Sequence, residues 1–241
     1  MVTVVLPIVV SLNVVVAQSP RFGRPSVDSL LVLSRAKAEH LAPDRPFDSA
    51  LIPSESKDER LAQERPHWPR GAAILVWIDA RNAPAGADAL VERAMTTWTD
   101  AAGRRFRLQR TSERDEAPLR VHFVRGGDNV YGEAQPRVDR RTGAIVEADV
   151  HINGDIASAG DRLDQRIILY LTALHELGHA LGLPHTDDFS TIMYSFRRPD
   201  DGERYFGAYR RRLRSADEVG SAQATGLAPA DVEALRALYG R

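Results

Sequence analysis

The sequence predicts an α+β fold, in which apolar strands and long amphipathic helices share one core. Three observations support this prediction. Residues 72–79 form a short apolar, β-rich run, residues 146–153 alternate apolar and polar side chains, and residues 87–101 repeat apolar side chains at helical spacing. The 241 residues suffice for one domain of ordinary size with additional segments, or for two small domains.

Composition narrows the classes of function. A formal net charge of −1 gives no electrostatic reason to expect a nucleic acid as partner. The chain has no cysteine, so it has neither disulfides nor thiolate metal ligands. Among its 32 basic residues only Lys37 and Lys57 are lysines, a bias that indicates GC-rich coding and a bacterial source. No feature indicates an oligomer, and we expect a monomer.

Residues 1–17 are almost entirely apolar and predict a signal peptide. Val15 and Ala17 supply small residues for cleavage before Gln18, and the run is too short for a confident membrane span. We therefore expect a secreted or extracytoplasmic protein without stable membrane association once the segment is removed. Because no Lys or Arg precedes the apolar core, a buried strand or a wrongly assigned start is the alternative.

Residues 18–69 are polar, charged and rich in proline, which predicts a prosegment or an N-terminal arm with one helix at 27–40. A plain linker explains the same composition. The regular pattern of the folded domain starts at about residue 70.

The strand at 72–79 opens this domain, and a helix follows whose buried face is marked by Ala87, Leu90, Val91, Ala94, Met95, Trp98 and Ala101. Gly103 closes that helix, and we assign Trp98 to the core. Residues 106–109 and 119–124 predict two further strands.

The next part of the chain combines a loop, a strand and a long helix. Asp128 and Asn129 in the loop 126–132 offer oxygens suited to calcium, although an ordinary turn has the same composition. In the strand at 144–153, Val146, Ala148, Val150 and Ile152 share one face, so an edge position is plausible. Residues 164–183 predict a helix.

The stretch from His175 to His185 reads HExxHxxGxxH. Residues four apart lie on one face of a helix, so His175 and His179 can point at one ion. Gly182 permits the positive φ that ends the helix, and His185 can return as a third ligand. Three neutral imidazoles suit zinc and leave a fourth position open for water, while Glu176 lies beside the metal without binding it. Histidines spaced this way by chance are the alternative, against which five fixed residues in eleven positions argue.

This stretch resembles the metzincin zinc peptidases. Met193, eight residues after His185, resembles their Met-turn, whose methionine packs beneath the ligands without binding the metal. Thr186 and Tyr194 look most like the matrixin branch of these peptidases. An ordinary core residue is the alternative for Met193.

The resemblance implies an enzyme of defined class and fold. It implies a secreted zinc endopeptidase with one catalytic zinc on His175, His179 and His185, and with Glu176 as general base acting on a protein or peptide. It also implies a metzincin catalytic domain over 70–241: a twisted, mostly parallel five-stranded sheet with an antiparallel edge strand, an active-site helix, and a C-terminal helix at 227–240. Matrixins often bind calcium as well.

In matrixins the strand before the active-site helix is an edge strand to which the substrate adds. The resemblance gives that role to about 144–153, and it implies substrate contacts for Ala148, Val150 and Tyr194. Of the ligands of a second, structural zinc only His151 has a counterpart, so we expect none. Residues 197–220 would form the wall of the pocket beyond the scissile bond. The arginines at 210–212 and 214 would then favour acidic substrates, unless the segment is a solvated loop.

Two other classes of function remain open. One is an inactive metzincin-fold module that binds peptides, against which the intact Glu176 argues. The other is a zinc amidase acting on a non-protein substrate, which the motif alone does not exclude.

Overall fold

The computed structural model describes residues 65–125, 131–155, 161–198 and 200–240. The predicted signal peptide, the predicted helix at 27–40 and the calcium candidates Asp128 and Asn129 lie outside the described residues. No helix in the described part of the chain is long and apolar enough to cross a membrane.

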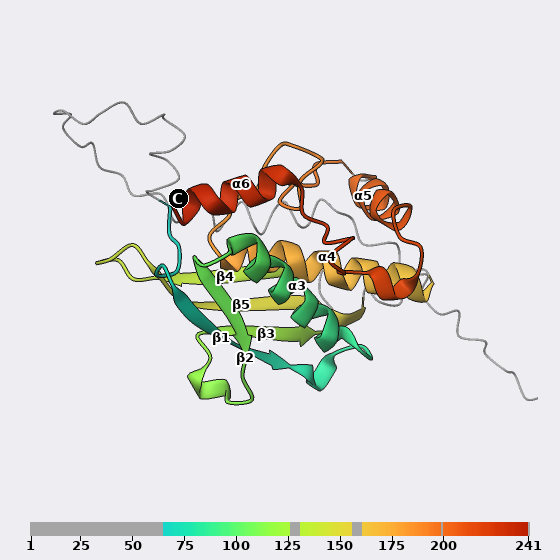
Figure 1. The fold of residues 1–241 in the computed structure, drawn as a ribbon. Helices are drawn as coiled ribbons and strands as arrows, with labels where there is room; N and C mark the ends of the chain where they lie inside the picture. The colour runs from blue at the N-terminus through green and yellow to red at the C-terminus, as the bar shows by residue number, and fades with distance from the viewer. Residues whose placement is uncertain (1–64, 126–130, 156–160, 199, 241) are drawn as a thin grey trace, which may run out of the picture.

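Five strands form one twisted sheet in the order β2-β1-β3-β5-β4 (Figure 1). The strands are β1 Ala72–Asp79, β2 Phe106–Arg110, β3 Leu119–Val124, β4 Gly132–Val138 and β5 Ile145–Asn153. Neighbouring strands run parallel except β4, which is antiparallel to β5. The predicted fold class, a mostly parallel five-stranded sheet with an antiparallel edge strand, is confirmed.

The identity of that edge strand corrects the sequence analysis. β5 pairs with β3 on one side and with β4 on the other, so the predicted edge position of residues 144–153 is wrong. Ala148 and Val150 are 1% and 0% exposed on this interior strand, and their main chain pairs within the sheet. Their predicted contact with an added substrate strand therefore has no free strand edge.

The true edge, β4, reads GEAQPRV and carries no alternating apolar pattern. An edge strand is paired on one side only and tolerates the missing N–H of Pro136. Such a strand gives little periodic signal in the sequence, which explains why no strand was predicted here.

In the described part of the chain, four α-helices accompany the sheet: α3 Ala87–Ala102, α4 Arg162–Ala180, α5 Asp201–Arg210 and α6 Pro229–Leu238. Short 3₁₀ turns lie at η2 Ala80–Asn82, η3 Arg114–Glu116 and η5 Ala216–Glu218. The helices gather on one side of the sheet, with α3 and α4 next to it (Figure 1). α5 lies inside the segment 197–220, where no helix was predicted.

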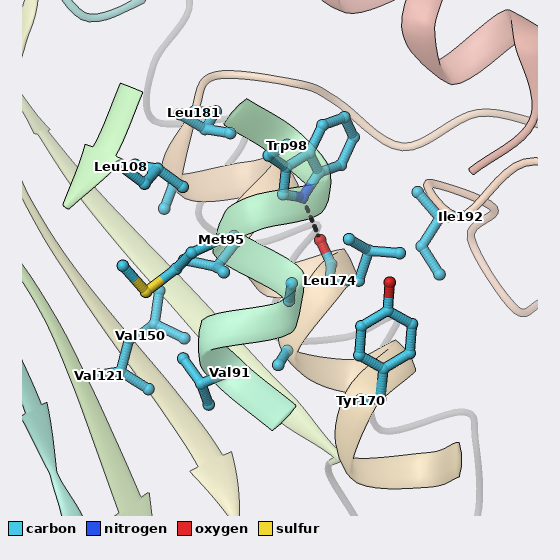
Figure 2. Packing of buried hydrophobic residues seen from close by; sticks show 14 of the residues in the cluster. Val91, Met95, Trp98, Leu108, Val121, Val150, Tyr170, Leu174, Leu181 and Ile192 are labelled. Carbon is cyan, nitrogen blue, oxygen red and sulfur yellow. Dashed lines mark hydrogen bonds between the residues drawn. The ribbon is translucent and has the colours of Figure 1, made fainter. Parts of the chain in front are cut away.

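The core lies between the sheet, α3 and α4. Trp98 of α3 is fully buried, and its indole Nε1 donates to the carbonyl of Leu174 on α4 at 2.8 Å (Figure 2). Val121 and Val150 meet α3 from the sheet side (Figure 2). The assignment of Trp98 to the core is confirmed, and its polar atom is satisfied where it is buried.

Segments far apart in the sequence hold the C-terminal end of α4. Gly182 has φ +97°, and a Cβ at this position would collide with the carbonyl oxygen of Pro66. The indole of Trp68 donates to the Ala180 carbonyl at 2.8 Å, and the Tyr239 hydroxyl donates to the Leu181 carbonyl at 2.9 Å. These contacts satisfy the last carbonyls of α4 and fix the start of the loop that leads to His185.

Candidate active site

Three imidazoles converge where α4 ends. His175 and His179 come from α4 and His185 from the loop after Gly182, and their Nε2 atoms lie 3.1–3.2 Å from one another. Within the described residues they form the one cluster of three or more potential metal ligands. The spacing of the motif therefore corresponds to real proximity.

The other ring nitrogens show which atoms face the centre. His175 Nδ1 donates to the Ile192 carbonyl at 2.6 Å, and His179 Nδ1 donates to the Leu183 carbonyl at 2.8 Å. Because a carbonyl oxygen only accepts, these rings hold their proton on Nδ1 and present an Nε2 lone pair to the centre.

Such lone pairs cannot bond to one another, but a cation compensates all of them. Tetrahedral zinc with its usual nitrogen distances separates its ligands by roughly 3.3 Å, close to the observed spacing. The three residues therefore fit a zinc ion.

Burial keeps the three histidines neutral. It lowers the pKa of His179 to about 4 and, with the neighbouring His179 as the second cause, that of His185 to about 3. The pKa of His175 lies well below its ordinary value for the same first reason. Neutral imidazole is the form that binds metal, so the site is ready for an ion at pH 7.

Glu176 lies on α4 beside the nitrogen cluster, and its side chain is 2% exposed. Burial, and secondarily the charge of Glu133, raises the pKa of this carboxyl to about 8. Its Oε2 is buried without a hydrogen-bond partner among the described residues. With this pKa the carboxyl is mostly protonated at pH 7 in the metal-free protein. A cation bound by the three histidines would favour the carboxylate, which is the form that accepts a proton.

The edge strand packs directly over this carboxyl. A Cβ on Gly132, the first residue of β4, would lie 2.7 Å from Cγ of Glu176 and 2.9 Å from Cγ2 of Thr172. Only a residue without a side chain allows this approach. The free edge of the sheet therefore begins next to Glu176.

The turn that contains Met193 lies under the histidines. Met193 is buried, and its side chain packs against Gly178 of α4, next to His179. The turn is held by α6, because Asp231 Oδ2 accepts from the main-chain nitrogen of Ile192 at 3.0 Å and from that of Ala228 at 2.8 Å. The sequence analysis missed Asp231, and no local pattern distinguishes it from other helical aspartates.

A narrow pocket opens beside His175 and Glu176. Its lining consists of Tyr131, Leu171, Thr172, His175, Glu176, Ile192, Phe196, Tyr205 and Phe206. The segment 197–220 contributes aromatic side chains from α5, and none of the arginines at 210–214 lines the pocket. Arg210 instead binds Asp161 and Asp164 at the start of α4.

Tyr194 is not part of the pocket lining. It is buried, and its hydroxyl donates to Asp201 Oδ2 at 2.9 Å. The predicted substrate contact of Tyr194 thus stays a prediction, and the bond visible here joins the Met193 turn to α5.

Comparison with known proteins agrees with this geometry. Macrophage metalloelastase of Oryctolagus cuniculus is 32% identical over 111 residues, which are 43% of this chain and 22% of the relative. The same enzyme of Rattus norvegicus is 29% identical over 150 residues, 60% of this chain and 30% of the relative. Interstitial collagenase of Bos taurus is 31% identical over 121 residues, 46% and 24% of the two chains. The chain thus spans less than a third of the length of these relatives.

The family model described as Matrixin matches residues 78–208, more than half of the chain. The match includes the HExxHxxGxxH stretch and the Met193 turn. It agrees with the resemblance seen in the sequence, and the chain belongs to the matrixin family.

Proposed function

We propose that this protein is a zinc-dependent endopeptidase that hydrolyses peptide bonds with Glu176 as general base. One observation carries the proposal: the Nε2 atoms of His175, His179 and His185 lie 3.1–3.2 Å from one another, and the buried carboxyl of Glu176 lies beside them. Membership of the matrixin family suggests a zinc metallopeptidase, and the chemistry of this donor set agrees with it.

The zinc ion and the protein side chains have different roles in the proposed reaction. Zinc, when bound by His175, His179 and His185, supplies Lewis acidity that lowers the pKa of water and polarises a carbonyl. Glu176 accepts the proton of the attacking water and passes it to the leaving nitrogen. The carbonyls of Ile192 and Leu183 keep two of the imidazoles oriented throughout.

An extended peptide substrate can pair with β4. Within the described residues, β4 is the last strand of the sheet and pairs with β5 alone, and its first residue lies against Glu176. An extended peptide that adds to β4 through main-chain hydrogen bonds would pass across the metal centre. β4 thus takes the role that the sequence analysis gave to residues 144–153.

The test is digestion of casein and of a peptide library by the full chain, with and without a zinc chelator and after zinc is restored. We expect cleavage that the chelator abolishes and zinc restores. Glu176→Ala should retain zinc and lose cleavage by several orders of magnitude. Full activity of Glu176→Ala would refute the general-base role. No cleavage by folded, zinc-loaded protein would favour a peptide-binding module or an amidase with a non-protein substrate.

The remaining parts of the proposal concern the whole protein. We propose an extracytoplasmic, monomeric enzyme of a bacterium, whose residues 1–17 are a signal peptide and whose residues 18–69 are a prosegment or arm. The apolar start of the chain and its proline-rich continuation support the signal peptide and the arm, and the near absence of lysine supports the bacterial source. Mass spectrometry of the mature N-terminus after expression tests it, and retention of Met1 would contradict the signal peptide.

A further inference from the structure

Two aromatic rings are the most exposed part of the described lining of the pocket beside Glu176. Seven of the nine lining residues are buried, and the two half-buried ones are Tyr131 and Phe206. Their rings meet edge to face, with centroids 5.5 Å apart and planes at 74°. Tyr131 lies just before β4 and Phe206 lies on α5, so the contact spans the pocket from the sheet side to the helix side.

The space behind these rings is small and free of arginine or lysine. The free space behind them has room for only a few atoms. Phe196 forms the inner wall, and its ring centroid lies 5.3 Å from that of Tyr205 and 6.3 Å from that of Phe206. A short aliphatic side chain suits this space, whereas a bulky aromatic or charged one does not.

The main chain around the contact is fixed on both sides. On the α5 side, Arg210 binds Asp161 and Asp164 at the start of α4, while the buried Asp201 accepts from the Tyr194 hydroxyl. On the other side, the Tyr131 carbonyl accepts from the main-chain nitrogen of Asn153 at 3.0 Å. Among the described residues, the two side chains themselves therefore set the aperture.

We propose that Tyr131 and Phe206 form an aromatic gate that limits the substrate residue next to the scissile bond to a small aliphatic side chain. Phe206 sets this limit from α5, and the preferred substrates carry Ala or Val at that position. The inference rests on the proposed peptidase function, because a peptide held on β4 and reacting at Glu176 must place a neighbouring side chain at this pocket. It replaces the acidic preference that the arginines suggested.

A matched pair of variants tests the gate. Phe206→Ala removes a ring that lines the pocket. Phe189→Ala removes a half-buried ring from the same aromatic cluster, 5.7 Å from Tyr205 and 5.0 Å from Tyr194, that does not line it. The substrates are peptides with Ala, Val, Leu, Phe or Trp next to the cleaved bond.

We expect the wild-type full chain to cleave the Ala and Val peptides with a kcat/KM at least tenfold above that for Phe and Trp. Phe206→Ala should raise kcat/KM for Phe and Trp at least tenfold, and Phe206→Leu should lie between. Phe189→Ala should keep the wild-type ratio within about twofold. Equal cleavage of all five peptides by the wild type, or the same ratio in both alanine variants, would overturn the gate.

A binding measurement separates this inference from the proposed function. The same peptides are titrated by calorimetry into zinc-loaded Glu176→Ala and into Glu176→Ala/Phe206→Ala. Tighter binding of the Phe and Trp peptides by the double variant alone supports the gate even if the wild type cleaves nothing. Identical affinities in the two proteins refute the gate even if the wild type is an active peptidase.

Discussion

At the scale of single residues, the proposed role of Glu176 conflicts with the stability of the fold. A carboxyl that is 2% exposed and has no hydrogen-bond partner for Oε2 within the described residues is costly to ionise. Its pKa of about 8 in the folded protein, against 4.5 when exposed, expresses that cost. The same features make it able to take up and release a proton near neutral pH.

Glu176→Gln should therefore stabilise the metal-free protein in a pH-dependent way. The folded pKa is raised, so the folded state holds the proton more tightly than the unfolded state, and stability is lost as pH rises from 4.5 through about 8. The variant escapes this loss. We expect wild-type and variant melting temperatures to agree near pH 4 and to diverge up to about pH 8, with the variant higher. A gap that does not change with pH would contradict the raised pKa.

At the scale of elements, α6 contacts the candidate metal site although it contributes none of the three histidines. Asp231 of α6 holds the Ile192 nitrogen, and the Ile192 carbonyl holds Nδ1 of His175. Ile192 thus links α6 to His175 through its main-chain nitrogen and carbonyl. Asp231 is a positioning residue in this chain of hydrogen bonds.

Loss of this support should weaken zinc binding. Asp231→Ala leaves the Ile192 and Ala228 nitrogens without their acceptor, and we expect zinc affinity to fall by about 10- to 100-fold. Asp231→Asn keeps an acceptor oxygen and should restore most of the affinity. Competition with a chromogenic chelator measures both variants. If Asp231→Ala binds zinc like the wild type while its melting temperature falls, the residue supports only the fold.

The elements also explain what the sequence could predict. β1, β3 and α3 are buried along one face, so their apolar periodicity gave correct or nearly correct bounds. β4 and α5 lack that signal: β4 is paired on one side only, and α5 contains Gly202 and Gly207. Their positions depend on contacts with distant parts of the chain, which no local pattern contains.

The candidate site also has a part that the sequence predicts and a part that it does not. Its ligands share eleven consecutive residues, where helical spacing and one glycine determine the geometry. Tyr131, Phe206 and Asp231 join this site from three separate parts of the chain. Tyr131 contacts Phe206, 75 positions away, and Asp231 binds the main chain of Ile192, 39 positions away. Pairings over such distances become visible only in the folded chain.

At the scale of the whole molecule, protonation of the candidate metal site is coupled to the stability of the fold. Three neutral imidazoles lie together at the end of α4. Trp68, the Met193 turn and α6 hold this part of the chain in place. In the unfolded chain each of these histidines has its ordinary pKa of 6.5, whereas burial lowers the folded values to about 4 for His179 and about 3 for His185.

Metal-free protein should therefore lose stability in acid. Below pH 6.5 the three histidines bind protons in the unfolded state but stay neutral in the folded state. The free energy of unfolding therefore falls as pH drops toward 4. Ionisation of Glu176 lowers the stability as pH rises above 4.5, which would mask the effect of the histidines. The measurement therefore uses Glu176→Gln, which has no such ionisation. In this background we expect the metal-free melting temperature to fall steadily from pH 6.5 to 4.5. Zinc-loaded protein should melt higher throughout, since the ion binds the folded state alone. A flat metal-free profile, or no stabilisation by zinc at pH 7, would show that the three histidines do not form a neutral metal site.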